Sequence, residues 1–173
     1  MKFRIVAFAA VTSIFRANFA SAGESVDMDA VASAQDHQLE NQARIDYAIA
    51  AIRSDEDLHR FLASAQSIDS PLNALSESSR RRFLSSLRFN DKGLTSFAYA
   101  DLETELTPTQ IYRVLKLFGA EHDAAFFSRA HIETDDDVKI MDMPRTPIDY
   151  RDYECAKRAT CTQSNFSICT GNC

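Results

Sequence analysis

The chain has 173 residues, with 25 acidic side chains against 19 basic ones and a net charge of −6 at pH 7. An acidic chain is repelled by phosphate backbones, so general nucleic-acid binding is not expected. The length suits one domain with a buried core.

Residues 1–22 have the features of an export signal: two basic residues, an apolar run over 5–15, and small residues before a cleavage site between Ala22 and Gly23. The apolar run is shorter than the roughly 20 residues that a membrane-spanning helix needs. A buried amphipathic N-terminal helix is the alternative. We predict export to the periplasm or beyond the cell, with no transmembrane segment once the signal is removed. Cleavage would leave 16 basic against 25 acidic residues.

The pattern of the remaining chain predicts an all-α fold: a small bundle of about five helices with an irregular, disulfide-stapled C-terminal tail. The expected parts are a flexible acidic arm over 23–38, a helical domain over 39–132, a proline-containing connector over 133–154 and a cysteine-rich tail over 155–173.

Apolar residues at helical spacing indicate the first two helices. Ile45, Ile49 and Ile52 fall at i, i+4 and i+7 and predict one buried stripe. Ser54 then begins Ser-Asp-Glu-Asp, which is typical of a helix start with acidic residues in its first turn.

The sequence "TPTQIYRVLKLFG" carries the clearest helix signal. Thr107 can cap the helix, Pro108 suits its first position, and Gln110 completes a capping box. Gly119 can end the helix. The preceding segment "FNDKGL", residues 89–94, interrupts the helical pattern and indicates a turn.

All four cysteines lie in the last nineteen residues, at Cys155, Cys161, Cys169 and Cys173. Their spacing lacks the paired C-x2-C knuckles of a structural zinc site. In an exported protein an even number of close cysteines predicts disulfides, here two, with three connectivities open. Thioether crosslinks to neighbouring serine and threonine residues are an alternative, which needs more chemical steps.

No residues form a pattern that predicts catalysis, a cofactor or a metal ion. His122 and Asp123, with His131 and the acidic run 135–137, carry side chains that could bind a metal ion, but the spacing of nine between the histidines does not match known helical sites. Other polar groups are expected to be turns or solvated helix faces. They are Asn90–Gly93, Arg80–Arg82, Glu103 and Glu105.

The block "FNDKGLTSFAYADLETELTPTQIYRVLKLFGAEH" and the ending "SICTGNC" resemble exported bacterial proteins of the bacteriocin fulvocin C-related family. The resemblance covers residues 83–122 and 150–173. It implies a bacterial, exported, cysteine-tailed protein linked to antagonism between bacteria, and it supplies no catalytic residues.

Two functional hypotheses follow. In the first, the protein is a non-enzymatic, bacteriocin-related precursor whose tail is the active peptide. In the second, the whole mature chain is a disulfide-stabilised binding or immunity module. Either hypothesis predicts a protein or cell-envelope partner and no nucleic acid.

Overall fold

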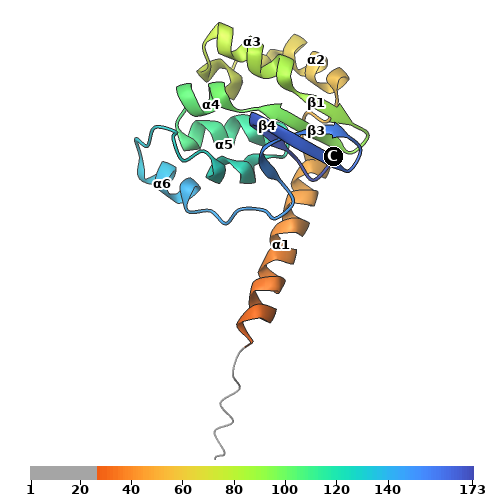
Figure 1. Cartoon of the computed structure of the whole chain (residues 1–173). Coiled ribbons are helices and arrows are strands. Elements are labelled where there is room, and N and C mark those ends of the chain that lie inside the picture. The colour runs from red at the N-terminus through yellow and green to blue at the C-terminus, as the bar shows by residue number, and fades with distance from the viewer. Residues whose placement is uncertain (1–26) are drawn as a thin grey trace, which may run out of the picture.

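The computed structural model describes residues 27–173, so the predicted export signal and its cleavage site lie outside the described residues. The α-helices are α1 (Met28–Ile49), α2 (Asp55–Ala63), α3 (Glu77–Ser86), α4 (Ala100–Glu105), α5 (Pro108–Lys116) and α6 (Asp135–Met141). Short 3₁₀ helices are η1 (Ala65–Ser67), η2 (Pro71–Ala74) and η3 (Glu121–Phe126). The strands are β1 (Arg88–Asn90), β2 (Gly93–Ala98), β3 (Tyr150–Lys157) and β4 (Thr160–Cys169). The prediction of an all-α fold is therefore wrong, because the fold mixes helices with a sheet (Figure 1).

The four strands form one antiparallel sheet in the order β1-β2-β4-β3. The second half of β4 pairs with β2, where Phe97 lies opposite Ile168. Both side chains are buried in the core. Segments about seventy residues apart in the chain are thus neighbours in the sheet, and the C-terminal segment is part of it.

The segment expected to be only a turn is the tip of the β1–β2 hairpin. The Asn90 side chain accepts a hydrogen bond from the Lys92 amide at 2.8 Å. Gly93 has φ +132°, a backbone conformation that residues other than glycine rarely adopt. Residues 93–97 are all buried. A strand buried on both faces shows no alternation of apolar and polar residues, which is why the pattern concealed it.

Aromatic rings join the sheet to the helices beneath it. Phe83 of α3 makes edge contacts with Phe97 of β2 and with Phe118 after α5, at centroid distances of 6.3 and 5.9 Å. All three rings are 1% exposed. Such contacts add to the free energy gained by burying the rings, and they pack α3 against the sheet and the segment after α5 against α3.

The predicted stripe on α1 is on the wrong face. Ile45 and Ile49 are 52% and 75% exposed, whereas Ala43 and Tyr47 are buried. Ile52, beyond the end of the helix, is fully buried, and its amide donates to the Leu117 carbonyl at 2.9 Å. The helix begins at Met28, so much of the expected flexible arm over 23–38 is helical. Its first half extends away from the body (Figure 1).

Two helix starts are confirmed. Thr107 and Gln110 form the expected capping box at the start of α5, which buries Ile111, Val114 and Leu115. Ser54 accepts a hydrogen bond from the Asp57 amide at the start of α2. Local capping patterns therefore located these helices correctly.

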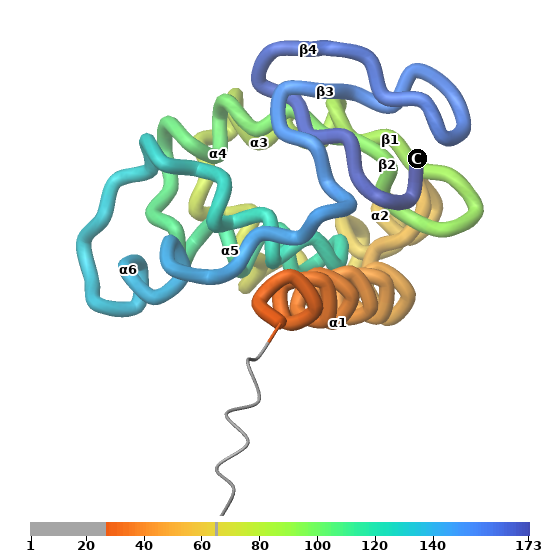
Figure 2. The backbone as a smooth tube through the Cα atoms, turned by 60° about the horizontal axis from the view of Figure 1, so that its bottom comes forward, coloured from red at the N-terminus to blue at the C-terminus, as the bar shows by residue number. Residues whose placement is uncertain are grey.

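The connector and tail are more ordered than expected. The connector over 133–154 contains α6 and the beginning of β3, with α6 started by a capping box between Thr134 and Asp137. The tail over 155–173 continues β3 and forms β4. The tail has few apolar residues, so an ordered structure was not expected there. Backbone hydrogen bonds between β4 and β2 hold it in the sheet. In Figure 2 the β3–β4 hairpin lies at the top of the view and α1 at the bottom.

Candidate functional site

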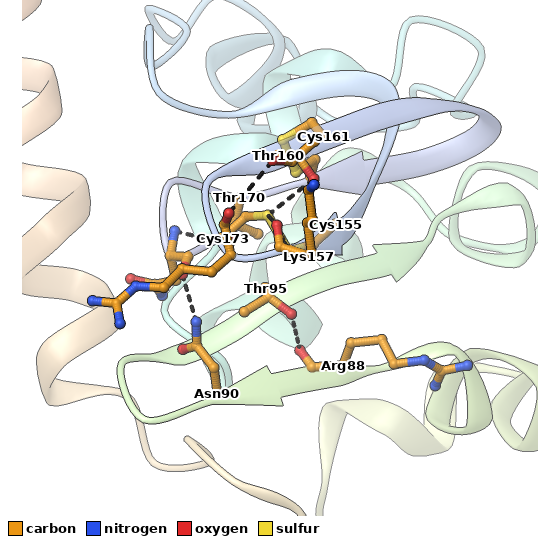
Figure 3. The surroundings of a disulfide bond; sticks show 12 residues. Arg88, Asn90, Thr95, Cys155, Lys157, Thr160, Cys161, Thr170 and Cys173 are labelled. Carbon is orange, nitrogen blue, oxygen red and sulfur yellow. Dashed lines mark hydrogen bonds between the residues drawn. A yellow bond between two sulfur atoms is a disulfide. The ribbon is translucent and has the colours of Figure 1, made fainter.

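The four cysteines form two disulfides. Cys155 is bonded to Cys173 and Cys161 to Cys169, with Cα atoms 5.6 and 6.0 Å apart. No free thiol occurs in residues 27–173. Figure 3 shows the Cys155–Cys173 bond above the β1–β2 hairpin, where the Asn90 side chain donates to the carbonyl of Asn172 at 2.7 Å. The disulfides therefore fasten the outer part of the β3–β4 hairpin close to the end of the chain.

Two backbone positions bend this hairpin. Asp152 and Phe166 have φ values of 64° and 62°, in the left-handed region. The Asp152 carboxylate accepts hydrogen bonds from the Tyr99 hydroxyl at 2.6 Å and from the Phe166 amide at 3.1 Å. Aspartate tolerates this conformation better than most residues. The β3–β4 pairing is irregular after Arg151, which lets the outer end turn back.

A buried polar cluster joins α1, η3 and the segment before β3. The Asp149 carboxylate accepts a hydrogen bond from the Tyr47 hydroxyl at 2.7 Å and lies 2.6 Å from His122 Nε2. Its other oxygen accepts from the Gly171 amide at 2.6 Å. The Tyr47 and His122 rings meet edge to face, with centroids 5.3 Å apart. We call Tyr47, His122, Asp123 and Asp149 the buried polar cluster.

Asp123 is the unusual member of the cluster. Its side chain is fully buried, and neither carboxylate oxygen has a hydrogen-bond partner among the described residues. Burial, together with the neighbouring Asp149 carboxylate, raises the pKa of Asp123 well above its ordinary value. Burial, Asp149 and Asp123 likewise raise the pKa of Tyr47 well above the ordinary value for tyrosine. Tyr47 is therefore a neutral hydrogen-bond donor.

The cluster has the donor atoms to hold a positive charge. One nitrogen of His122 and carboxylate oxygens of Asp123 and Asp149 all lie within 4.8 Å of one another. Two buried carboxylates at this separation repel each other unless a proton or a cation lies between them. The arrangement can thus share a proton or bind a metal ion.

Sequence reasoning found half of this cluster. His122 and Asp123 were weighed as metal ligands, but with the wrong partners. His131 is 81% exposed and lies 3.8 Å from Glu133. Tyr47 and Asp149 were missed, and no local pattern marks them, since they are 102 residues apart in the chain.

The acidic run 135–137 has a structural role at the start of α6. Asp137 is buried and accepts hydrogen bonds from the Thr109, Glu133 and Thr134 amides at 2.8, 3.1 and 2.9 Å. Burial alone would raise its pKa, but these bonds outweigh that effect and hold the pKa of Asp137 well below its usual range. The residue caps one helix and fastens α6 to α5.

Other candidate polar groups also have structural partners. Glu103 lies 3.4 Å from the Arg151 guanidinium, and Glu105 accepts hydrogen bonds from the Ser76 and Ser79 hydroxyls. The arginines at 80–82 pair in turn with the partners Asn73, Glu77 and Asp101.

Several hollows include residues of α1 in their walls. One of about 630 Å³ has a mostly apolar lining that includes Ile49, Ala51, Pro71 and Leu117. We call it the apolar groove. Residues of both charges also line it: Asp46, Asp69, Arg113, Lys116 and Glu121.

The smaller hollow, of about 260 Å³, lies between α1, η3 and the segment before β3. His122 is in its wall, next to Ala43, Tyr112 and Thr146. Asp123 is not among the lining residues, and its side chain is fully buried. The histidine is thus the member of the cluster that a solute in this hollow would meet.

Comparisons with protein-family models, with curated proteins and with solved structures find no match to this chain. In the part of the chain that the structure describes, no helix is both long and apolar enough to cross a membrane. The resemblance to the bacteriocin fulvocin C-related family stays a prediction.

Proposed function

We propose that the mature chain acts as one intact, exported, non-enzymatic binding module, which is the second of the two hypotheses and includes a role as an immunity-type partner. The observation that carries this proposal is the position of β4 between β2 and β3. Two disulfides fit the oxidising setting of an exported protein.

The contacts of the last residues favour the intact module over a precursor that releases its tail. Ile168 and Cys169 are fully buried, and the Thr170 amide donates to the Thr95 carbonyl at 2.9 Å. The Thr170 hydroxyl and the Asn172 side chain both donate to the Leu94 carbonyl, at 2.5 and 3.1 Å. Release of the tail would expose the β2 edge and leave these core positions empty.

The apolar groove is the surface that we assign to the partner. Its volume lies within the range of about 300–1,000 Å³ that is usual for ligand sites. Arg113 and Lys116 line the groove together with Asp46 and Asp69. Charges of both signs complement a protein segment that carries both, rather than a polyanion or an anionic membrane surface. The occupant is thus a partner's peptide segment with an apolar side chain between charged residues.

Intact mass of the protein recovered from its native culture tests the first part of the proposal. We expect the mass of the mature chain, increasing by four hydrogen atoms on reduction of the two disulfides. A C-terminal fragment that is active alone would overturn the proposal and establish the precursor. A fragment that has lost water and has no free thiols after reduction would indicate thioethers.

A peptide-display library panned against the folded protein tests the groove. We expect peptides with an apolar residue flanked by both charges to be enriched, and Ile49→Lys to abolish their binding. Ile49 is 75% exposed at the end of α1, where a cation is favourable, so the variant should keep its stability. Ile132→Lys is the matched control, since Ile132 is 50% exposed and outside the groove. Enriched peptides that bind both variants equally would contradict the assignment.

A further inference from the structure

The buried polar cluster is incomplete as it stands. Both oxygens of Asp123 and Nδ1 of His122 are buried without a hydrogen-bond partner among residues 27–173. A buried polar group that is left unpaired destabilises the folded state. Burying a carboxylate is far more costly unless it is paired with an ion. Asp123 therefore needs either a proton or a cation as its partner in the cluster.

The available donor atoms suit a transition-metal ion. His122 Nε2 lies 2.6 Å from one Asp149 oxygen and 3.9 Å from Asp123 Oδ1. An imidazole nitrogen with two carboxylate oxygens is a donor set that Zn²⁺ accepts, and three protein ligands leave a fourth position open. Magnesium and calcium prefer oxygen ligands alone, so the histidine favours a transition metal.

We propose that His122, Asp123 and Asp149 bind one divalent transition-metal ion, with Zn²⁺ as the fitting example. The ion would take the place of the close contact between His122 and Asp149, and it would give Asp123 the partner that it lacks. Because the three residues come from η3 and the segment before β3, the ion would tie the end of the connector to the helical body.

Neighbouring groups hold one of these ligands in place. The Tyr47 hydroxyl donates to one oxygen of Asp149 and the Gly171 amide to the other. Hydrogen bonds of this kind orient metal-binding carboxylates and strengthen the site. Access is from the smaller hollow, where His122 forms part of the wall. Neither the groove nor its partner enters this inference, so it can fail without affecting the proposed function.

The test uses the full mature protein with its disulfides intact, stripped of metal by a chelator and titrated with Zn²⁺. We expect native mass spectrometry to show one zinc per chain and the melting temperature to rise, because an ion that binds only the folded state stabilises it. Asp123→Asn and His122→Gln should each weaken binding by at least about a hundredfold. His131→Gln should bind as tightly as the wild type, since His131 is exposed and outside the cluster.

Three results would overturn the inference: no zinc bound by the wild type, binding unchanged by Asp123→Asn, or binding lost in His131→Gln. If both cluster variants fail to fold, the wild type and His131→Gln decide the question by the zinc-induced rise in melting temperature. A rise in both supports the site, and its loss in His131→Gln assigns the ion to the surface. A gain in stability of Asp123→Asn without zinc binding would show that a proton fills the cluster instead.

Discussion

The two ends of the β3–β4 hairpin are held in place by different means. At the inner end, Ile168 and Cys169 are fully buried where β4 pairs with β2. At the outer end, every side chain from 153 to 163 is exposed or half-buried. Disulfides from Cys155 and Cys161 join the outer end to the inner one.

This difference shows how a chain with few apolar residues near its end can still be ordered. Burial stabilises a segment in proportion to the apolar area removed from water, and the outer end offers little. A crosslink needs no such area, because it restricts the unfolded chain. We therefore expect the inner end to share the global stability of the fold, and the outer end to depend on its disulfides.

Removing side-chain volume at the inner end should have the largest effect. Ile168→Ala empties a fully buried position opposite Phe97, and we expect it to lower the free energy of unfolding by about 3–4 kcal/mol. Denaturant unfolding at pH 7 measures the change. Ile45→Ala is the matched control, since Ile45 is 52% exposed, and it should change the free energy by about 0.5 kcal/mol or less. Equal losses in the two variants would mean that the inner end is not part of the core.

Removing a crosslink should have a smaller and more local effect. Cys155→Ser with Cys173→Ser opens a loop whose ends are 18 residues apart, and we expect a loss of about 2–3 kcal/mol. Hydrogen exchange should show that residues 153–163 lose protection while β2 keeps it. If β2 lost protection equally, the two ends would form one cooperative unit and the comparison would fail.

Local patterns predicted the parts of the fold that local interactions determine. The capping box at Thr107 and the cap at Ser54 depend on residues three positions apart, so they could be recognised from the sequence. The strands could not, because β2 and β4 are paired across about seventy residues and β2 shows no alternation. Tertiary pairing made strands of segments whose local pattern indicated a turn, a connector and an irregular tail.

The buried polar cluster, like the strands, could be predicted only in part from the sequence. His122 and Asp123 are adjacent in the sequence and were considered together, whereas Asp149 follows 27 residues after His122 in a segment expected to be a connector. Only the folded chain brings Tyr47 to Asp149. The prediction of a buried stripe on α1 was wrong because an isoleucine at helical spacing can line an exposed groove, as Ile49 does, as well as a core.

Acidification should weaken the bend at which the two ends of the hairpin meet. Of the three changes, we expect this one to have the smallest effect on stability. Asp152 lies where the hairpin bends, and its carboxylate accepts from the Tyr99 hydroxyl and the Phe166 amide. The hydrogen bond from the Tyr99 hydroxyl is the main cause that lowers the pKa of Asp152. Partial burial opposes it, but with the further hydrogen bond from the Phe166 amide the pKa of Asp152 stays below its usual range. A carboxylate with a lowered pKa stabilises the fold fully above the ordinary aspartate pKa of about 3.9. That contribution is lost as the pH falls below this value towards the pKa in the folded protein.

Asp152→Asn isolates this contribution, because asparagine keeps the shape and tolerates the left-handed φ of 64° but carries no charge. The variant should melt a few degrees below the wild type at pH 7, as expected for about 1 kcal/mol or less at a half-exposed site. The difference should shrink as the pH is lowered from 5 to 2, since the wild-type carboxylate then also becomes neutral. Thermal unfolding of both proteins across that range measures it. A difference that stays constant with pH would show that shape rather than charge holds the bend, and the junction would then belong with the buried inner end.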